Sequence, residues 1–192
     1  MSAIVERFAP LFRPRGIIVT GVSQHPGKFG TVTLHNLLSR GYRGEIFPIN
    51  REGVESFGRP TYKSVSEVPK GRADLAFICT PNQVNEDLLR ECAVVGVRAA
   101  FVASAGYGES EDGREMERRL VALGAELDVL IAGPNGQGLI STPVSMCAQI
   151  VAPMPPAGVI GIASQSGGFS SSWGNLARQS GVALGDPHVG LG

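Results

Sequence analysis

A glycine-rich segment near the start of the chain, GVSQHPGKFG at residues 21–30, has the composition of a loop that binds phosphate. Gly21, Gly27 and Gly30 let the backbone turn tightly and approach a ligand, and Lys28 adds a cation. A helix that begins behind such a loop presents unpaired N–H groups and the positive end of its dipole to an anion. The spacing matches neither G-x-G-x-x-G nor a Walker A loop, so a phosphate site of another kind and a purely structural turn both stay open.

The residues at the end of the second apolar run indicate which class of phosphate-containing ligand the site suits. That run ends Pro48-Ile49-Asn50-Arg51, whereas an NAD site usually has an acidic residue there to hold the ribose hydroxyls. Arg51 is instead suited to pair with a ribose phosphate, which NADP and coenzyme A (CoA) both carry. The competing interpretation is that Arg51 is an ordinary solvated arginine.

Three further segments at the ends of apolar runs carry small and polar residues. They are Cys79-Thr80-Pro81-Asn82, Ala103-Ser104-Ala105-Gly106-Tyr107-Gly108 and Gly133-Pro134-Asn135-Gly136-Gln137-Gly138. Because the carboxyl ends of parallel strands share one edge of a sheet, we expect these segments beside the glycine loop. Each segment alone is typical of a turn, but together they predict a rim on which an extended ligand lies flat.

The elements that position these segments follow from the periodicity of apolar residues. Near-continuous apolar runs alternate with amphipathic stretches, which predicts repeated β–α units and a parallel sheet covered on both faces. The predicted strands are 16–22, 45–50, 74–80, 98–104 and 129–133, the predicted helices are 27–40, 83–95 and 112–123, and a helical turn is predicted at 64–68. The fold class is therefore α/β, with a Rossmann-like parallel sheet and helices on both faces.

The pattern changes after Asn135, and we predict three parts: a first domain at 1–140, a connector at 141–157 and part of a second α/β domain at 158–192. The connector is proline-rich and includes one short strand, MCAQIV. A buried strand is predicted at 158–164, followed by a turn and a helix on which Trp173 is expected in the core. One β–α unit is too small to bury its own core, so this part should pack on the first domain or on further chain.

The overall composition excludes several functions. Lys+Arg and Asp+Glu are both 17, so there is no general attraction for nucleic acid or an anionic membrane, and neither is expected as a partner. No apolar run reaches the length of a membrane span, and no signal peptide is recognisable. The three cysteines are scattered, which favours reduced thiols and a cytoplasmic location, and no metal-ligand spacing is present.

The ordered set of motifs resembles the CoA-binding part of NDP-forming acyl-CoA synthetases, the superfamily of the succinyl-CoA synthetase alpha subunit. The set is G-x(5)-G-K-x-G, P-x-N-R, T-P-N, S-A-G-Y-G-E, G-P-N-G-x-G and S-Q-S-G-G, and it covers roughly residues 8 to 185. The resemblance implies a CoA-binding Rossmann-like domain followed by the start of a flavodoxin-like, succinyl-CoA synthetase-like ligase domain.

The resemblance also implies a role for individual residues. The glycine loop would hold the CoA pyrophosphate, the second strand end would lie by the adenosine, and the later strand ends would border the pantetheine arm and the thiol. The implied CoA-binding residues are Gly21, Ser23, Gly27, Lys28, Phe29, Gly30, Pro48, Asn50, Arg51, Thr80, Pro81, Asn82, Ser104, Ala105, Gly106, Pro134 and Asn135. The start of the last helix, Ser164, Gln165, Ser166, Gly167 and Gly168, would cradle a phosphorylated histidine.

The reaction implied is the ligation of a carboxylic acid to CoA, with phosphoryl passing through a histidine and an acyl phosphate. In the family that histidine lies well beyond Ser166, and His188 does not match its motif. ATP or ADP and Mg²⁺ would bind in an ATP-grasp domain or subunit outside this chain. We therefore expect no catalytic residue here, CoA binding without complete ligation, and association into an oligomer.

Other functions compete with this interpretation. An NADP-dependent oxidoreductase is compatible with Arg51, although no catalytic Tyr/Lys or His/Asp set stands out. A non-catalytic CoA-binding module fits the missing histidine. A serine hydrolase is disfavoured, because the residues around Ser166 do not form G-x-S-x-G.

Overall fold

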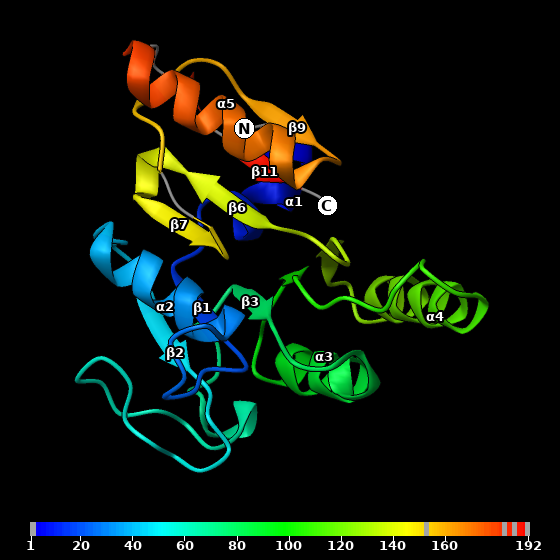
Figure 1. Ribbon diagram of the computed structural model, residues 1–192. Helices are drawn as coiled ribbons and strands as arrows, with labels where there is room; N and C mark the ends of the chain where they lie inside the picture. Colours follow the sequence, from blue (N-terminus) through cyan, green and yellow to red (C-terminus); the bar gives the residue numbers. More distant parts are fainter. Residues whose placement is uncertain (1–2, 152–153, 182–183, 186–187, 191–192) are drawn as a thin grey trace.

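The computed structural model describes residues 3–151, 154–181, 184–185 and 188–190. Its centre is a five-stranded parallel sheet with the strand order β2-β1-β3-β4-β5 (Figure 1). The strands are β1 Gly16–Val19, β2 Glu45–Pro48, β3 Leu75–Ile78, β4 Ala99–Val102 and β5 Leu130–Ala132. Each lies within a predicted apolar run, and the α/β class with a parallel sheet is confirmed.

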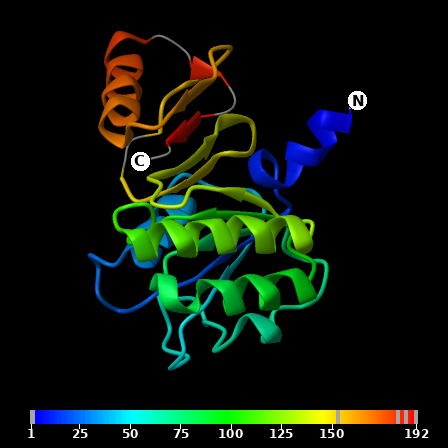
Figure 2. The same ribbon diagram turned by 90° about the vertical axis from the view of Figure 1, so that its right-hand side faces the viewer.

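Helices cover both faces of this sheet. Figure 1 shows α2 on one side and α3 with α4 on the other, and Figure 2 shows α3 and α4 lying side by side. The helices are α1 Ala3–Phe12, α2 Phe29–Ser39, α3 Asn85–Val94, α4 Glu111–Glu126 and α5 Gly167–Ser180, with short 3-10 turns η1 Val65–Glu67, η2 Asn82–Val84 and η3 Thr142–Val144. The sheet separates two apolar cores, one beneath α3 and α4 and one beneath α2.

Local sequence explains where these elements form. Every residue of β1, β3 and β4 is buried, which suits strands covered on both faces. The rings of Phe77 and Phe101 stack with centroids 5.2 Å apart, which joins β3 to β4 across the α2 face. Ser110 caps the start of α4, because its side chain accepts a hydrogen bond from the Gly113 N–H, and two acidic residues occupy the first turn of the helix.

The segment predicted as a connector holds part of a second sheet. Strands β6 Gly138–Ser141 and β7 Met146–Gln149 form an antiparallel hairpin, and β11 His188–Gly190 and β9 Ile162–Ser164 extend it in the order β7-β6-β11-β9. The Asn36 side-chain amide of α2 donates to the Gln149 carbonyl oxygen at 2.8 Å. The hairpin therefore covers the α2 face of the main sheet. Pro153 of the predicted connector lies outside the described residues.

Two expectations about the last part of the chain are wrong. The predicted buried strand at 158–164 is instead two short strands, β8 Ala157–Gly158 and β9. Strand β8 pairs with β10 Leu184–Gly185, and Val159, between β8 and β9, is 96% exposed. Trp173 was expected in the core but is 41% exposed beside Phe169 on α5. Both side chains are apolar, but the described part of the chain leaves each of them exposed.

An ion pair fixes the start of the main sheet. Asp74, just before β3, accepts hydrogen bonds from the Arg15 backbone N–H at 2.7 Å and from its guanidinium at 2.6 and 3.0 Å. Burial alone would raise the pKa of Asp74, but the hydrogen bonds and charge of Arg15 outweigh it and hold that pKa below its ordinary value. The pair ties the entry of β1 to the entry of β3.

We expect Asp74→Asn to lower the melting temperature at neutral pH by roughly 2–4 °C, because charge-assisted hydrogen bonds are lost. Since the folded-state pKa is depressed, this stabilisation is present above the unfolded-state pKa and is lost as pH falls through the folded-state pKa. Melting curves between pH 7 and pH 2 should therefore converge at low pH. Asp128→Asn, which removes an exposed pair with Arg98, is the control and should change little. A constant gap at all pH values would contradict the ion-pair explanation.

Candidate functional site

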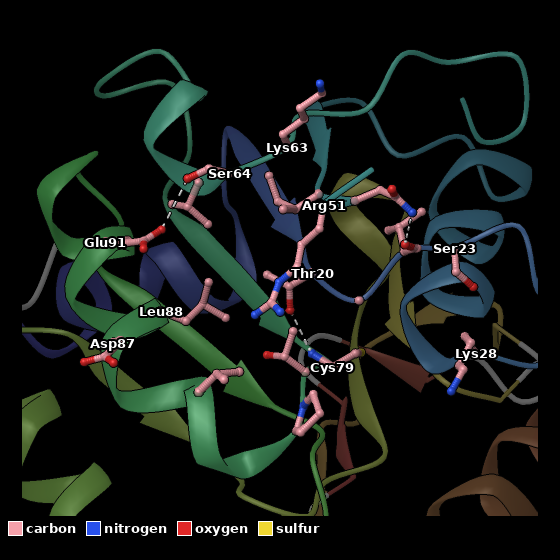
Figure 3. Close-up of a pocket in the computed structure, with 18 residues that line it drawn as sticks. Thr20, Ser23, Lys28, Arg51, Lys63, Ser64, Cys79, Asp87, Leu88 and Glu91 are labelled. Carbon is pink, nitrogen blue, oxygen red and sulfur yellow. Dashed lines mark hydrogen bonds between the residues drawn. The ribbon is translucent and has the colours of Figure 1, made fainter. Parts of the chain in front are cut away.

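A cavity of about 620 Å³ lies at the carboxyl edge of the main sheet. The chain leaves β1 toward β2 on one side, while β3 lies on the other, so the loops that follow β1 and β3 diverge. Such a switch point opens a crevice in parallel α/β sheets. Figure 3 shows the cavity between the loop after β1, the loop after β2 and α3. Its walls are Thr20, Gly21, Val22, Ser23, Lys28, Ile49, Asn50, Arg51, Lys63, Ser64, Val65, Cys79, Thr80, Pro81, Val84, Asp87, Leu88 and Glu91.

The glycine loop is held close to the sheet by contacts that only glycine permits. Gly21 has φ +68°, and a Cβ atom there would lie 2.8 Å from the Cys79 carbonyl oxygen. A Cβ atom on Gly30 would lie 2.3 Å from the Thr20 carbonyl oxygen. The Thr31 hydroxyl donates to the Ser23 carbonyl oxygen at 2.9 Å and accepts from the Ser23 N–H at 3.0 Å. The loop is thus fixed against the first turn of α2.

The N-terminus of α2 is suited to hold an anion. Lys28 occupies the N-cap position with extended backbone angles and gives the helix no side-chain cap. The N–H groups of the first turn have no carbonyl partner within the helix, so an anion would satisfy them. His25 supports the turn, since its Nδ1 accepts from the Gly27 N–H at 3.1 Å. The residues present therefore fit a phosphate or pyrophosphate group.

Thr20 closes the floor of the cavity between β1 and β3. It is 1% exposed, and its Oγ1 accepts a hydrogen bond from the Cys79 N–H at 3.0 Å (Figure 3). The backbone N–H of Thr20 donates to the Phe77 carbonyl oxygen at 3.0 Å. The two strands thus stay joined up to the point where their loops separate.

The loop after β2 brings two cations to the cavity. Arg51 extends across it toward Thr20, and Lys63 lies at the rim where the same loop returns (Figure 3). Lys63 was missed by the sequence analysis, because no periodic pattern links it to Arg51. Asn50 lines the cavity, but its amide is occupied: it donates to the Val22 carbonyl oxygen at 2.8 Å and accepts from the Glu52 N–H at 2.9 Å. Asn50 therefore joins two loops.

The wall opposite the glycine loop is apolar with an acidic border. Leu88 of α3 points into the cavity, and Val65 and Val84 add apolar surface (Figure 3). Glu91 lies at the border, where its carboxylate accepts a hydrogen bond from the Ser64 hydroxyl at 3.5 Å. These residues were also missed, since in the sequence they belong to ordinary amphipathic segments. An apolar wall with polar edges suits a flat heterocyclic base.

The Cys79 thiol lines the cavity but is not activated as a nucleophile. Burial raises its pKa far above the ordinary value, and a hydrogen bond with Thr33 only partly offsets this. This direction favours the protonated thiol over the thiolate at neutral pH.

The cavity brings together seven of the CoA-binding residues predicted from sequence: Gly21, Ser23, Lys28, Asn50, Arg51, Thr80 and Pro81. Gly27, Phe29 and Gly30 belong to the loop and helix start behind it, while Pro48 is buried in β2. The remaining six lie outside the cavity walls, along the same sheet edge: Asn82, Ser104, Ala105, Gly106, Pro134 and Asn135.

The residues predicted to hold a phosphorylated histidine, 164–168, form the N-terminus of α5 and the two residues before its cap. Ser166 caps the helix by accepting a hydrogen bond from the Phe169 N–H at 3.3 Å, and the Ser164 hydroxyl accepts from the Ser166 N–H at 3.0 Å. Gln137, from the loop after β5, donates to the Ser171 hydroxyl at 2.5 Å. The start of α5 therefore adjoins the β5 end of the rim.

Comparison with known families settles what kind of domain this is. Residues 15–139 match the family described as CoA binding domain. The chain belongs to this family. The matched range contains the whole cavity, from the glycine loop to Glu91.

Relatives of this CoA-binding chain are ligases. It is 36% identical over 162 residues to the alpha subunit of acetate–CoA ligase (ADP-forming) I of Pyrococcus furiosus, covering 82% of this chain and 35% of the relative. It is 34% identical to acetate–CoA ligase (ADP-forming) I of Archaeoglobus fulgidus, covering 91% and 25%. The CoA-binding chain thus spans about a third or less of these relatives.

A solved structure supports the same fold. The dinucleotide-forming acetyl-coenzyme A synthetase 1 of Ca. Korarchaeum cryptofilum, in complex with phosphate and ADP, superposes with a TM-score of 0.89 at 30% identity. The match covers 96% of the CoA-binding chain and 39% of that synthetase. Among the described residues, no helix is both long and apolar enough to cross a membrane.

The close approach at Gly21 gives a prediction for the glycine loop. We expect Gly21→Ala to reduce the free energy of unfolding by about 2–5 kcal/mol, because its methyl group meets the Cys79 carbonyl as well as requiring a left-handed backbone. Gly41→Ala is the matched control, since Gly41 has φ +70° but no atom within 4 Å of its Cβ position. That change should cost about 1–2 kcal/mol. Urea unfolding measures both, and equal losses would argue against crowding at Gly21.

Proposed function

We propose that the cavity and the adjoining sheet edge bind coenzyme A, with the phosphorylated nucleotide in the cavity and the pantetheine arm along the rim. The observation that carries this proposal is the distribution of charge along the edge. Lys28, Arg51 and Lys63 all lie at the β2–β1 end. The strand-end segments at 80–82, 103–109 and 133–137 contain no lysine or arginine, and Glu109 is acidic. A ligand with phosphates at one end and an uncharged arm at the other matches this order.

Each part of the nucleotide has a matching surface. The uncapped start of α2 with Lys28 would take the pyrophosphate. Arg51 and Lys63 would pair with the ribose 3′-phosphate, and the apolar wall around Leu88 would hold the adenine. The cavity volume is within the range of small-molecule sites. Arg51 is the residue on which discrimination in favour of a phosphorylated ribose rests.

The arm would run past the ends of β3 and β4 and reach the end of β5 with its thiol. Pro134 and Asn135 lie there, and the Asn135 amide donates to the Glu109 carboxylate at 3.3 Å. Gln137 of the same loop contacts the start of α5. The thiol would thus lie close to the helix terminus predicted to stabilise a phosphoryl group, which is where an acyl phosphate must meet it.

For the whole protein we propose an NDP-forming acid–CoA ligase, like the relatives that the chain matches in part. CoA supplies the thiol that attacks the activated acid, and this chain binds and orients it. The phosphohistidine, the ATP-grasp unit with ATP or ADP and Mg²⁺, and most of the carboxylic acid site would lie in other domains or subunits. A cytoplasmic, oligomeric enzyme is the setting that fits reduced cysteines and an exposed apolar α5 face.

Calorimetry tests the proposal directly, with CoA, dephospho-CoA and NADPH as ligands. We expect CoA to bind in the micromolar range and dephospho-CoA to bind about tenfold or more weakly, since an arginine–phosphate pair is worth over 1.4 kcal/mol. Arg51→Ala should weaken CoA binding by a similar factor but leave dephospho-CoA binding nearly unchanged. Arg43→Ala is the control, because Arg43 is exposed and outside the cavity walls.

The alternatives give different results in the same titrations. Binding of NADPH without binding of CoA would overturn the proposal in favour of an oxidoreductase. Binding of CoA by a chain that never associates with an ATP-grasp protein would support a non-catalytic CoA-binding module instead of a ligase.

A further inference from the structure

A buried asparagine joins the loops that follow β3 and β4. Asn85, the first residue of α3, is 0% exposed and lies behind the rim, outside the cavity walls. Its Oδ1 accepts a hydrogen bond from the Thr80 hydroxyl at 2.8 Å. Its Nδ2 donates to the Ser104 hydroxyl at 3.0 Å and to the Tyr107 hydroxyl at 3.1 Å. One side chain thus uses its acceptor and both its donors on two different loops.

The partners of Asn85 complete a closed network. The Ser104 hydroxyl donates to the Thr80 carbonyl oxygen at 2.6 Å, which links the two strand ends directly. Tyr107, only 4% exposed, donates its hydroxyl to the Asn82 carbonyl oxygen at 3.4 Å. The Asn82 amide donates back to the Gly106 carbonyl oxygen at 3.1 Å. The segments 80–82 and 104–107 are therefore held as one unit at the middle of the rim.

We propose that Asn85 is a positioning residue for CoA: acting through Thr80 and Ser104, it fixes the section of the rim that receives the pantetheine arm. This inference rests on the proposed function and deepens it, because it assigns the affinity for the arm to a residue that does not touch the ligand. The cationic end of the site is held by other contacts, those of Asn50, Thr31 and Thr20. Thr80 also lines the cavity, at its border with the rim, so Asn85 supports the arm section beyond that border while the phosphate-binding loops keep their own contacts.

The chemistry of this position requires an amide. The hydrogen of Ser104 is already given to the Thr80 carbonyl, so Ser104 offers Asn85 only lone pairs and needs a donor. A carboxylate would place its own lone pairs against those of Ser104 inside an apolar setting. A leucine would leave the Thr80 and Tyr107 hydroxyls without this buried partner, which is costly for groups removed from water.

The test compares two ligands that share adenosine 3′,5′-bisphosphate, of which only CoA also carries the phosphopantetheine arm. CoA and adenosine 3′,5′-bisphosphate are titrated into the wild-type chain and into Asn85→Ala. We expect the dissociation constant for CoA to rise about tenfold, or about 1.4 kcal/mol, and that for the bisphosphate to change less than about twofold. Asn36→Ala is the matched control, because it removes another buried amide whose carbonyl partner, Gln149, lies away from the site. It should lower the melting temperature while leaving both dissociation constants unchanged.

A milder variant keeps the test decisive if Asn85→Ala does not fold. Tyr107→Phe removes one hydroxyl from the network, keeps the ring, and should weaken CoA binding alone by about threefold, which corresponds to about 0.6 kcal/mol. Equal weakening of both ligands, or no weakening of CoA by either variant, would overturn the positioning role while CoA binding itself stood. If the wild-type chain bound neither ligand, the proposed function would fail and this inference with it.

Discussion

The parallel pairing of β1 with β2 on one side and β3 on the other is the constraint from which the site follows. It forces the chain to leave β1 in a direction opposite to that of the later β–α units, and it opens the sheet edge where α2 begins. Gly21 and Gly30 allow α2 to start close against the strands, and Thr20 keeps β1 and β3 joined beneath. The cavity, its cations and its apolar wall occupy the space that this divergence leaves.

The two ends of the rim differ in the kind of interaction that they offer, which is charge at one end and a fixed backbone shape at the other. At the β2–β1 end, Arg51 and Lys63 supply charge, and much of the backbone support comes from polar side chains that bond to loops, such as that of Asn50. The segments at 80–82 and 103–109 contain no lysine or arginine, and buried hydroxyls and amides fix the course of their backbone. Charge tolerates small displacements of its partner, whereas an uncharged chain depends on close fit, which gives a reason for the more elaborate network where the proposed ligand would offer less charge.

The sequence predicted the five strands because buried parallel strands are continuous apolar runs, and it placed the rim because all their loops share one edge. The residues that it missed, such as Lys63, Glu91 and Asn85, lie in segments whose local pattern predicts no site, and only tertiary contacts bring them to the cavity or behind the rim. Asn50 was expected beside the ligand and does line the cavity, where its amide bonds to the backbone of Val22 and Glu52. Trp173 was expected in the core since the helical period places an apolar residue there, but period alone does not reveal whether anything packs on that face.

The hairpin of β6 and β7 determines where the chain can be cut or fused without breaking a core. Leu139 of β6 and Met146 and Ala148 of β7 pack in the same core as Phe77 and Phe101 of the main sheet, while β6 also pairs with β11 from the far end of the chain. A gene split or fusion near residue 140 would therefore cut within β6 and detach β7 from the core that it shares, and would leave apolar surface and an open strand edge prone to aggregation. A junction placed after Gln149 keeps both strands of the hairpin with the main sheet and gives up only the pairing of β6 with β11, so it should be tolerated better.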